Sequence, residues 1–410
     1  MNKKIKFDSS YDVKKGVSIK NRFFKSAMSE QLADADHNPT KGLVRLYKTW
    51  AHGGVGLLVT GNVMVDRRAL GEPKNVVLDG ASELSVFKSW AQACQENNTK
   101  VWMQLNHPGK QIPKFLCKEP VAPSAIPLAQ GLESTFNTPR ELTTEGIQAI
   151  IKQFATAAGL AKKTGFDGVQ IHGAHGYLVN QFLSPRHNQR TDEWGGSLEN
   201  RMRFVLEVYR AIKAEVGEAF PIGIKLNSAD YMKGGFDDND SMQVVESLAE
   251  AGIDLIEISG GTYESPSMVG YKVKDSTRKR EAYFLEFADK IRKLVSTPLV
   301  VTGGFRSGAA MQEALNSGAT DMIGLARPLA VQPNLPNKLI ADNLYKIQMK
   351  DPSTGLKFVD DMVMIKMSWY ESQLARLAKG KKTIPNQNAW ISVAQTLSGL
   401  GLHAFKQRRA

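Results

Sequence analysis

Cysteine is nearly absent from this chain, which has only Cys94 and Cys117 among its 410 residues. The two are far apart in the sequence and form no CxxC motif, so the chain lacks the thiolates of a four-cysteine iron–sulfur or zinc site. A disulfide framework is excluded for the same reason. We therefore expect a protein of a reducing compartment and predict a cytoplasmic location.

Long hydrophobic runs are also absent. Nowhere do about 18 apolar residues follow one another, which is the length that a membrane-spanning helix needs. The lysine-bearing segment Met1–Ser10 has no apolar stretch of signal-peptide length. With 42% hydrophobic and 23% charged residues, the chain has the composition of a soluble, folded protein.

Acidic residues are the minority, at 41 against 53 lysines and arginines, which gives a formal net charge of +12. Much of the excess lies in Lys366–Ala410, which has eight basic residues and one acidic residue. A positive charge keeps nucleic acids, anionic membranes and phosphate-bearing ligands open as partners. Its concentration near the C-terminus makes it largely a property of the tail.

Between about Arg22 and Asp342, short apolar runs alternate with amphipathic stretches, which is the pattern of βα units around a parallel sheet. The predicted strands are Arg22–Met28, Val55–Gly61, Lys100–Leu105, Gly168–His172, Pro221–Leu226, Leu255–Ser259, Pro298–Thr302 and Asp321–Leu325. The predicted helices are Gly42–His52, Ser82–Asn97, Thr144–Thr164, Leu198–Val216, Asp240–Ala251, Tyr283–Val295 and Gly308–Ser317, with a last one after Pro333. Eight such units favour a closed barrel over an open doubly wound sheet. We predict the α/β class, with a single (β/α)8 TIM barrel over residues 1–342 and a basic helical extension over residues 343–410.

Two histidines and a tyrosine follow the fourth predicted strand. A strand ending at His172 would place His172, His175 and Tyr177 at the C-terminal mouth of the barrel, where barrel enzymes keep their active sites. Two imidazoles and a phenol there can bind an anion or a carbonyl oxygen, and the phenol can deliver a proton. The alternative is a structural role, in which the two loop histidines only cap backbone groups. We expect no metal, because no carboxylate or cysteine has a fitting spacing to the HxxH pair.

Glycine-rich turns follow the last two predicted strands. The seventh leads into Thr302-Gly303-Gly304-Phe305, and the eighth leads into Gly324-Leu-Ala-Arg327. Barrels build phosphate sites at these two places from backbone N–H groups, and an arginine adds charge-assisted donors. Ordinary tight βα turns are the alternative interpretation.

The stretch HGAHGYLVNQFLSPRHNQRTDEWGGSLENRMRF, which begins at His172, together with GGF and GxARP downstream, resembles the Old Yellow Enzyme family of FMN-dependent NAD(P)H:flavin oxidoreductases. The resemblance runs from about Asn21 to Pro336. It implies a barrel that holds FMN at its mouth, is reduced by NADH or NADPH, and is reoxidised by an alkene conjugated to an electron-withdrawing group, as in an ene-reductase.

The resemblance also implies roles for individual residues. Those that match flavin-binding positions of the family are Ala27, Met28, Ser29, Gly61, Gln104, Lys225, Gly303, Gly304, Ala326 and Arg327. Gln104 would contact the pyrimidine edge of the flavin, and Lys225, where the family usually has Arg, would stabilise the anionic reduced flavin. His172 and His175 match the pair that polarises the substrate carbonyl, and Tyr177 matches the proton donor.

Two other functions remain alternatives. A flavin barrel that acts on RNA, as dihydrouridine synthases do, would need a cysteine acid near the flavin, and neither Cys94 nor Cys117 has the expected neighbouring motif. A non-catalytic flavin-binding barrel would be expected to lose the histidine pair or the phosphate glycines, which are present. We therefore expect a small-molecule substrate and no nucleic-acid partner.

The tail is expected to form a helix over Asp361–Lys379, a linker over Gly380–Asn388 and a second helix. One face of the second helix would collect Trp390, Val393, Ala394, Leu397 and Leu400 or Leu402, which recur at three- and four-residue steps. We expect this face to pack on the barrel or on a second subunit of a homo-oligomer. Attachment to an anionic membrane is the alternative, which we consider less favoured.

The glycine motifs predict the identity of the cofactor. They offer one monophosphate site, and no dinucleotide fingerprint precedes a βα unit. The purified protein should therefore be yellow and release one FMN per chain on heating, as identified by chromatography. Release of FAD, or a colourless protein that takes up no FMN, would contradict this.

Overall fold

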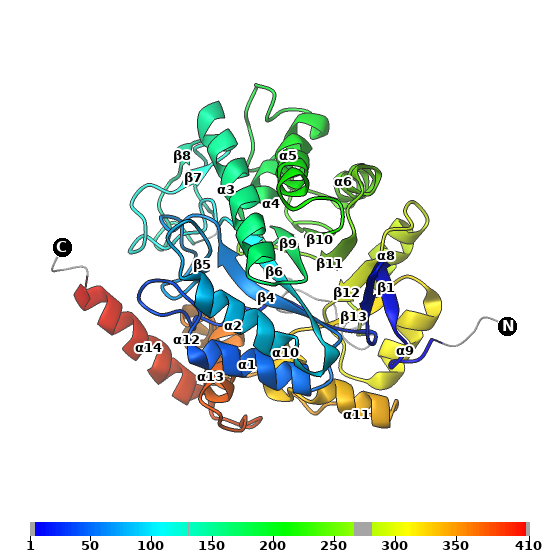
Figure 1. Ribbon diagram of the computed structural model, residues 1–410. Coiled ribbons are helices and arrows are strands. Elements are labelled where there is room, and N and C mark those ends of the chain that lie inside the picture. The colour runs from blue at the N-terminus through cyan, green and yellow to red at the C-terminus, as the bar shows by residue number, and fades with distance from the viewer. Residues whose placement is uncertain (1–4, 130, 266–280, 407–410) are drawn as a thin grey trace.

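Eight parallel strands form a closed barrel in the computed structural model, which describes residues 5–129, 131–265 and 281–406. The barrel strands are β3 (Phe23–Lys25), β4 (Leu57–Met64), β6 (Lys100–Asn106), β9 (Gly168–Gly173), β10 (Ile222–Asn227), β11 (Leu255–Ser259), β12 (Leu299–Thr302) and β13 (Met322–Leu325). The last strand pairs with the first, since Ile323 aligns with Phe23 in parallel register, and β3 pairs in turn with β4. This closure confirms the predicted α/β barrel (Figure 1).

Helices cover the outside of the barrel (Figure 1). They are α1 (Lys41–His52), α2 (Leu84–Cys94), the 3-10 turn η1 (Glu96–Asn98), α3 (Thr144–Lys163), α4 (Leu178–Leu183), α5 (Leu198–Val216), α6 (Asp238–Ala251), α8 (Leu285–Arg292), α9 (Gly308–Ser317), α10 (Arg327–Val331) and α11 (Leu335–Ala341). Capping side chains set several starts, because Thr40, Thr143 and Ser197 each accept a hydrogen bond from a backbone N–H of the first turn. The predicted helix Ser82–Asn97 is shorter than expected, because Asn97 adopts a left-handed φ of 58° that ends the regular helix.

Three short strands belong to loops around the mouth. β5 (Val76–Val77) pairs with the end of β4. β7 (Val121–Ala122) and β8 (Arg140–Glu141) pair in parallel and so join the middle of the long loop between β6 and α3 to its end.

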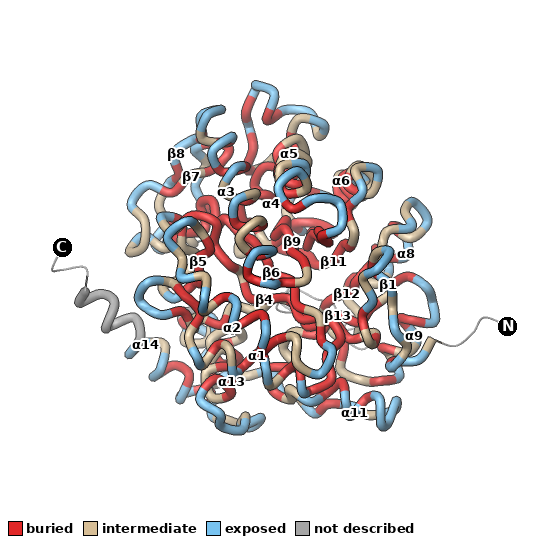
Figure 2. Tube along the Cα trace, in the orientation of Figure 1, coloured by how far each residue is buried: buried red, intermediate tan, exposed pale blue. Residues whose placement is uncertain are grey.

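An N-terminal hairpin packs against the beginnings of the barrel strands, and the sequence analysis did not predict it. Its strands are β1 (Tyr11–Lys14) and β2 (Val17–Ile19). The buried side chains of Val13 and Ile19 join a cluster with Phe24, Leu57, Val59, Trp102, Leu255, Val300 and Met322 from the barrel interior. This cluster is separate from the larger core between barrel and helices, and the central strands are buried throughout (Figure 2).

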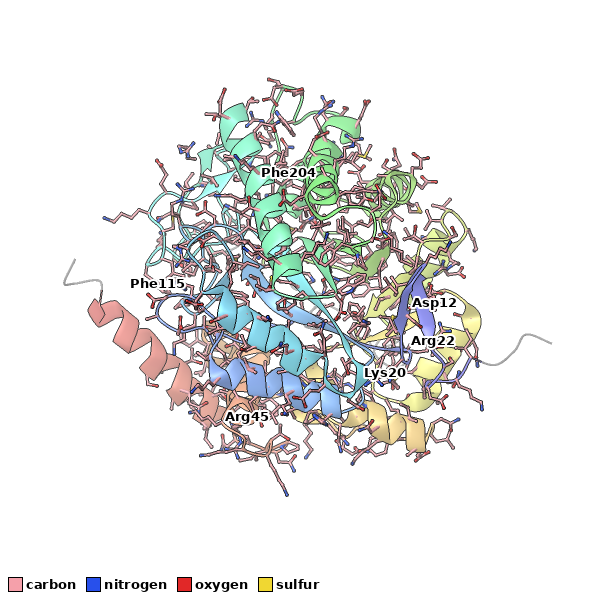
Figure 3. The ribbon with its side chains drawn as sticks, viewed as in Figure 1. Asp12, Lys20, Arg22, Arg45, Phe115 and Phe204 are labelled. Atoms are coloured by element: carbon pink, nitrogen blue, oxygen red, sulfur yellow. The ribbon has the colours of Figure 1, made fainter. Side chains whose placement is uncertain are left out.

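The C-terminal extension forms three helices, α12 (Lys357–Met362), α13 (Ile365–Ala378) and α14 (Ala389–Lys406). The helix α13 packs against α1 and α10 of the barrel. Arg45 on α1, labelled in Figure 3, donates through Nη1 to the carbonyl oxygen of Ala378, 2.8 Å away. The predicted linker 380–388 contains neither helix nor strand. Among the described residues, none of the helices combines the length and apolar character needed to cross a bilayer.

The last helix packs on α13 only near its beginning. Val393 is buried, but Trp390, Ala394 and Leu397 of the expected packing face are exposed. For these three residues the predicted packing on the barrel is wrong, because the helix runs outward beyond α13 (Figure 1) and turns Ala389, Ser392 and Val393 toward it. Packing of Trp390, Ala394 and Leu397 on a second subunit stays a prediction.

The hairpin cluster predicts a large effect of a small substitution. Ile19→Ala removes a side chain that is 0% exposed and leaves a cavity below the barrel strands, so the free energy of unfolding should fall by about 2–5 kcal/mol. The urea midpoint measures this. Leu344→Ala, at a position 75% exposed, is the control and should shift the midpoint little. Equal midpoints for both variants would show that the hairpin does not seal the core.

Candidate active site

A cleft of about 210 Å³ opens at the C-terminal ends of the barrel strands, the end where barrel enzymes bind their substrates. Its walls come from the ends of β10 to β13, from the segment after β3, and from α13 of the extension. The sequence-predicted residues that line it are Ala27, Met28, Ser29, His175, Lys225, Gly303, Gly304, Ala326 and Arg327. The fold therefore brings together segments that are about 300 residues apart in the chain.

Two predicted flavin ligands lie outside the lining of this cleft. Gln104 is buried inside the barrel and donates through Nε2 to Oε1 of Gln170, 2.8 Å away. Gly61 is covered by α1, and its N–H donates to the Tyr47 hydroxyl at 2.7 Å. Their roles in flavin binding stay predictions.

The two histidines lie side by side at the end of β9. His172 Nε2 is 3.3 Å from His175 Nδ1, and His175 Nε2 is 2.8 Å from Ser259 Oγ. His175 has a φ of 63°, an unfavourable conformation for a residue with a side chain. The N–H of His175 donates to Asn227 Oδ1 at 3.2 Å, which helps to hold this turn in place.

Tyr177 completes the cluster. Its ring centroid is 4.7 Å from that of His172, and its hydroxyl is 3.0 Å from the hydroxyl of Tyr263. Burial raises the pKa of Tyr177 well above its usual value, with the neighbouring Tyr263 acting in the same direction. The phenol therefore stays protonated and can act as an acid.

Burial also keeps both imidazoles neutral. It lowers the pKa of His172 and of His175 well below 6.5, and the positive charge of Lys225 lowers them further. A neutral imidazole has one N–H donor and one acceptor nitrogen. His172 Nδ1 is buried without a hydrogen-bond partner in the described part of the chain. The pair can therefore donate to a ligand oxygen without carrying charge.

A buried carboxylate lies below the cleft, and the sequence analysis missed it. Glu257 on β11 is 0% exposed and forms an ion pair with Lys225 at 3.1 Å. It also accepts hydrogen bonds from Ser26 Oγ, from Thr302 Oγ1 at 2.8 Å and from Gln170 Nε2 at 2.9 Å. The available signal was an acidic residue inside the apolar run Leu255–Ser259.

The glycines after β12 and β13 lie at the other end of the cleft, where they let neighbouring protein groups approach the backbone closely. Gly303 and Gly304 have φ values of 129° and 90°, and a Cβ on Gly304 would lie 2.7 Å from the Tyr283 ring. A Cβ on Gly324 would lie 1.8 Å from Thr302 Oγ1. Arg306 and Arg327 line the same end. Exposed backbone and two guanidinium groups suit a phosphate, so this end of the cleft fits the phosphate of FMN.

The extension supplies one wall of the cleft, which the sequence analysis did not predict. Lys366, Met367, Tyr370, Glu371 and Leu374 of α13 line it. The barrel pattern gave no signal for them, because they follow the last barrel helix and approach the mouth only through the packing of α13 on α1 and α10.

Glu371 is the acidic residue of this wall. Its Oε2 accepts a hydrogen bond from Gln31 Nε2 at 3.0 Å. Burial and the nearby carboxyl of Glu72 raise the pKa of Glu371 to about 8. Glu72 in turn accepts a hydrogen bond from the Ser29 hydroxyl. The Glu371 carboxyl is therefore mostly protonated near neutral pH.

The mouth of this closed (β/α)8 barrel gathers glycine-rich turns, a buried lysine and a neutral histidine pair. Such an arrangement is typical of enzymes that bind a phosphorylated cofactor. The chain belongs to the NADH:flavin oxidoreductase / NADH oxidase family, which it matches over residues 11–346. This confirms the resemblance to the Old Yellow Enzyme family. The protein is an oxidoreductase whose cofactors are FMN and NADH or NADPH.

Individual relatives agree with this family. The NADH-dependent flavin oxidoreductase iliE of Hypocrea jecorina is 39% identical over 366 residues, which are 83% of this chain and 89% of that protein. A cinnamate reductase of Clostridium sporogenes is 32% identical over 81% of this chain, which spans about half of that longer protein, 52%. The structure of an old yellow enzyme homologue from Zymomonas mobilis superposes with a TM-score of 0.70 at 25% identity, covering 83% of this chain and 94% of that one.

The raised pKa of Glu371 predicts a pH-dependent stability. Between the usual carboxyl pKa of 4.5 and about 8, the unfolded chain loses this proton while the folded chain keeps it, so stability falls as the pH rises through this window. Glu371→Gln removes this loss. The melting temperature of the variant relative to wild type should therefore rise from pH 5 to about pH 8 and then level off. Glu250→Gln, at an exposed position, is the control. A difference that does not change with pH would show that Glu371 is ionised in the folded protein.

Proposed function

We propose that the chain is an ene-reductase, which uses hydride from NADH or NADPH to reduce a carbon–carbon double bond conjugated to a carbonyl or a similar electron-withdrawing group. The observation that carries this proposal is the buried cluster of His172, His175 and Tyr177, in which His175 lines the cleft and the other two lie behind it. The name of the relative from Clostridium sporogenes, a cinnamate reductase, supports the same class of substrate. Bound FMN would supply the relay of hydride from the nucleotide to the substrate.

The histidine pair would bind and polarise the substrate. Their facing ring nitrogens, His172 Nε2 and His175 Nδ1, lie 3.3 Å apart, and an oxygen atom that accepts from both would replace this contact between the rings. Neutral donors held by the barrel stabilise charge that develops on that oxygen without needing to reorganise. Ser259 Oγ, 2.8 Å from His175 Nε2, would fix the orientation of the second ring.

Tyr177 would donate the proton to the carbon alpha to the carbonyl. The hydroxyl stays protonated because it is buried, and Tyr263 at 3.0 Å connects it to a second hydroxyl from which the proton can be replaced. Lys225 would balance the negative charge of the reduced cofactor from the floor of the cleft. The residues after β12 and β13 would hold the phosphate.

The alternatives have less support. Cys94 is buried in α2 and Cys117 lies in the loop between β6 and α3, and neither lines the cleft, so neither is placed to serve as the acid of an RNA-modifying barrel. A purely flavin-binding role leaves the strained, neutral histidine pair without a purpose. We also propose a small-molecule substrate, a cytoplasmic location and no nucleic-acid partner.

Tyr177→Phe tests the proposal. Anaerobic reduction of the yellow protein by NADPH or NADH should stay near the wild-type rate, because that step needs no proton from Tyr177. Reoxidation by 2-cyclohexenone should slow by about 10²–10⁴-fold, which is the usual contribution of a positioned acid. Stopped-flow absorbance of the flavin separates the two steps.

The matched control is Tyr231→Phe, since the Tyr231 hydroxyl contacts only Ser228 among the described partners and the residue is 51% exposed. Both of its half-reactions should match wild type. If Tyr177→Phe slows both half-reactions equally, the ring has a structural role and the assignment of the acid fails. If wild-type protein is reduced but no enone, nitroalkene or cinnamate reoxidises it, the proposed substrate class fails.

A further inference from the structure

A buried hydroxyl on the extension has no hydrogen-bond partner in the described part of the chain. It belongs to Tyr370 on α13, a residue that is only 4% exposed. Burying a hydroxyl without a partner costs on the order of 1–3 kcal/mol, so such groups are rare in folded proteins and indicate a missing ligand or water. Tyr370 therefore points to something that binds beside it.

The surroundings of Tyr370 identify the phosphate end of the cleft. The residue lines the same cleft as Gly303 and Gly304, and the Arg327 guanidinium lies 5.8 Å from the centre of its ring. The other charges that act on its hydroxyl are those of Arg306 and Asp351. The hydroxyl is thus placed among the groups that suit an anion.

Asp351, an acidic residue at this end of the cleft, is already paired with two cations. Asp351 Oδ1 is 3.4 Å from Arg306 Nη2, and Asp351 Oδ2 is 3.8 Å from Lys366 Nζ. Two cations therefore share one carboxylate, and Arg327 adds a third cation. Glu281 brings a second carboxylate to this turn, where its Oε2 accepts hydrogen bonds from the N–H groups of Arg306 and Ser307 at 2.6 and 3.0 Å. Three cations and two carboxylates therefore lie near this end, and the cations suit a bound phosphate.

Tyr370 is held in place independently of any ligand. Its ring packs edge-on against Trp369 at 5.0 Å, and Trp369 Nε1 donates to the Gln387 carbonyl oxygen at 3.0 Å. The contact between Arg45 and Ala378 fixes the end of the same helix on the barrel. A donor that is already ordered loses little entropy when it binds a ligand.

We propose that the Tyr370 hydroxyl donates a hydrogen bond to the phosphate of bound FMN, so that α13 forms the outer wall of the phosphate site. The family match ends at residue 346, so this contact comes from a segment outside the shared barrel. Burial raises the pKa of Tyr370 above its usual value, so the hydroxyl remains a donor at neutral pH. The extension would then discriminate FMN from flavins without a phosphate.

Comparing FMN with riboflavin tests this proposal, because riboflavin has the same ring and lacks the phosphate. The full-length protein is stripped of flavin and titrated with each, following flavin fluorescence. Tyr370→Phe should weaken FMN binding by about 10- to 100-fold, the effect of losing a hydrogen bond to a charged group. Riboflavin binding should change less than about twofold, which also shows that the variant is folded.

Tyr345→Phe is the matched control, since the Tyr345 hydroxyl contacts Gln332 at 3.0 Å and lines a different cleft. Its affinities for both flavins should equal those of wild type. Equal losses of FMN and riboflavin affinity in Tyr370→Phe would overturn the proposal in favour of a packing role. Unchanged FMN affinity would also overturn it, with water as the partner of the hydroxyl.

A second measurement needs no variant. Amide hydrogen exchange of α13 in the wild-type protein should slow when FMN is bound and should slow less with riboflavin, since only FMN would contact the helix through its phosphate. Equal protection by both flavins would contradict the contact. Neither readout depends on the alkene substrate, so the proposal can fail while the ene-reductase assignment holds, and the reverse.

Discussion

The Glu257 carboxylate connects the strands that form the floor of the cleft. It accepts hydrogen bonds from Ser26 after β3, Thr302 on β12 and Gln170 on β9, and it forms an ion pair with Lys225 on β10. A buried charge of this kind is tolerated only when its oxygens are satisfied, and removing one partner leaves the remaining charge exposed to a low dielectric. The same interaction that keeps the mouth of the barrel together therefore fixes the only described cation on the cleft floor, Lys225.

The chemistry of the site follows from this floor. Lys225 and burial together keep His172 and His175 neutral, so the pair acts through N–H donors rather than through charge. The positive φ of His175 is supported by a hydrogen bond from its N–H to the side-chain oxygen of Asn227, which lies at the end of β10 two residues after Lys225. The strained backbone of His175, the neutral imidazoles and the position of Lys225 therefore belong to one arrangement. In it, rigid N–H donors would face the oxygen of a substrate as that oxygen gains charge.

The extension changes what the barrel can do. The barrel supplies the glycine cradle and the arginines of the phosphate end, but the helix α13 covers that end and brings Tyr370 and Glu371 to it. These two neighbours face different parts of the cleft, since Tyr370 lies near Arg327 and Glu371 contacts Gln31. The outward course of α14 leaves Trp390 and Leu397 about half exposed, so the extension closes one surface and leaves another uncovered.

The sequence by itself determined the eight βα units, the glycine turns after β12 and β13, and the His172–His175–Tyr177 motif. These are local patterns: apolar periodicity indicates strands and helices, and a turn with positive φ favours glycine. Only the tertiary structure decided that Glu257 meets Lys225, that Gln104 donates to Gln170 inside the barrel, that the hairpin of Val13 and Ile19 packs against the strand beginnings, and that Tyr370 lines the cleft beside Arg327. Each of these contacts joins segments distant in the chain, and their geometry is set by barrel closure and helix packing, for which a single sequence has no local signal.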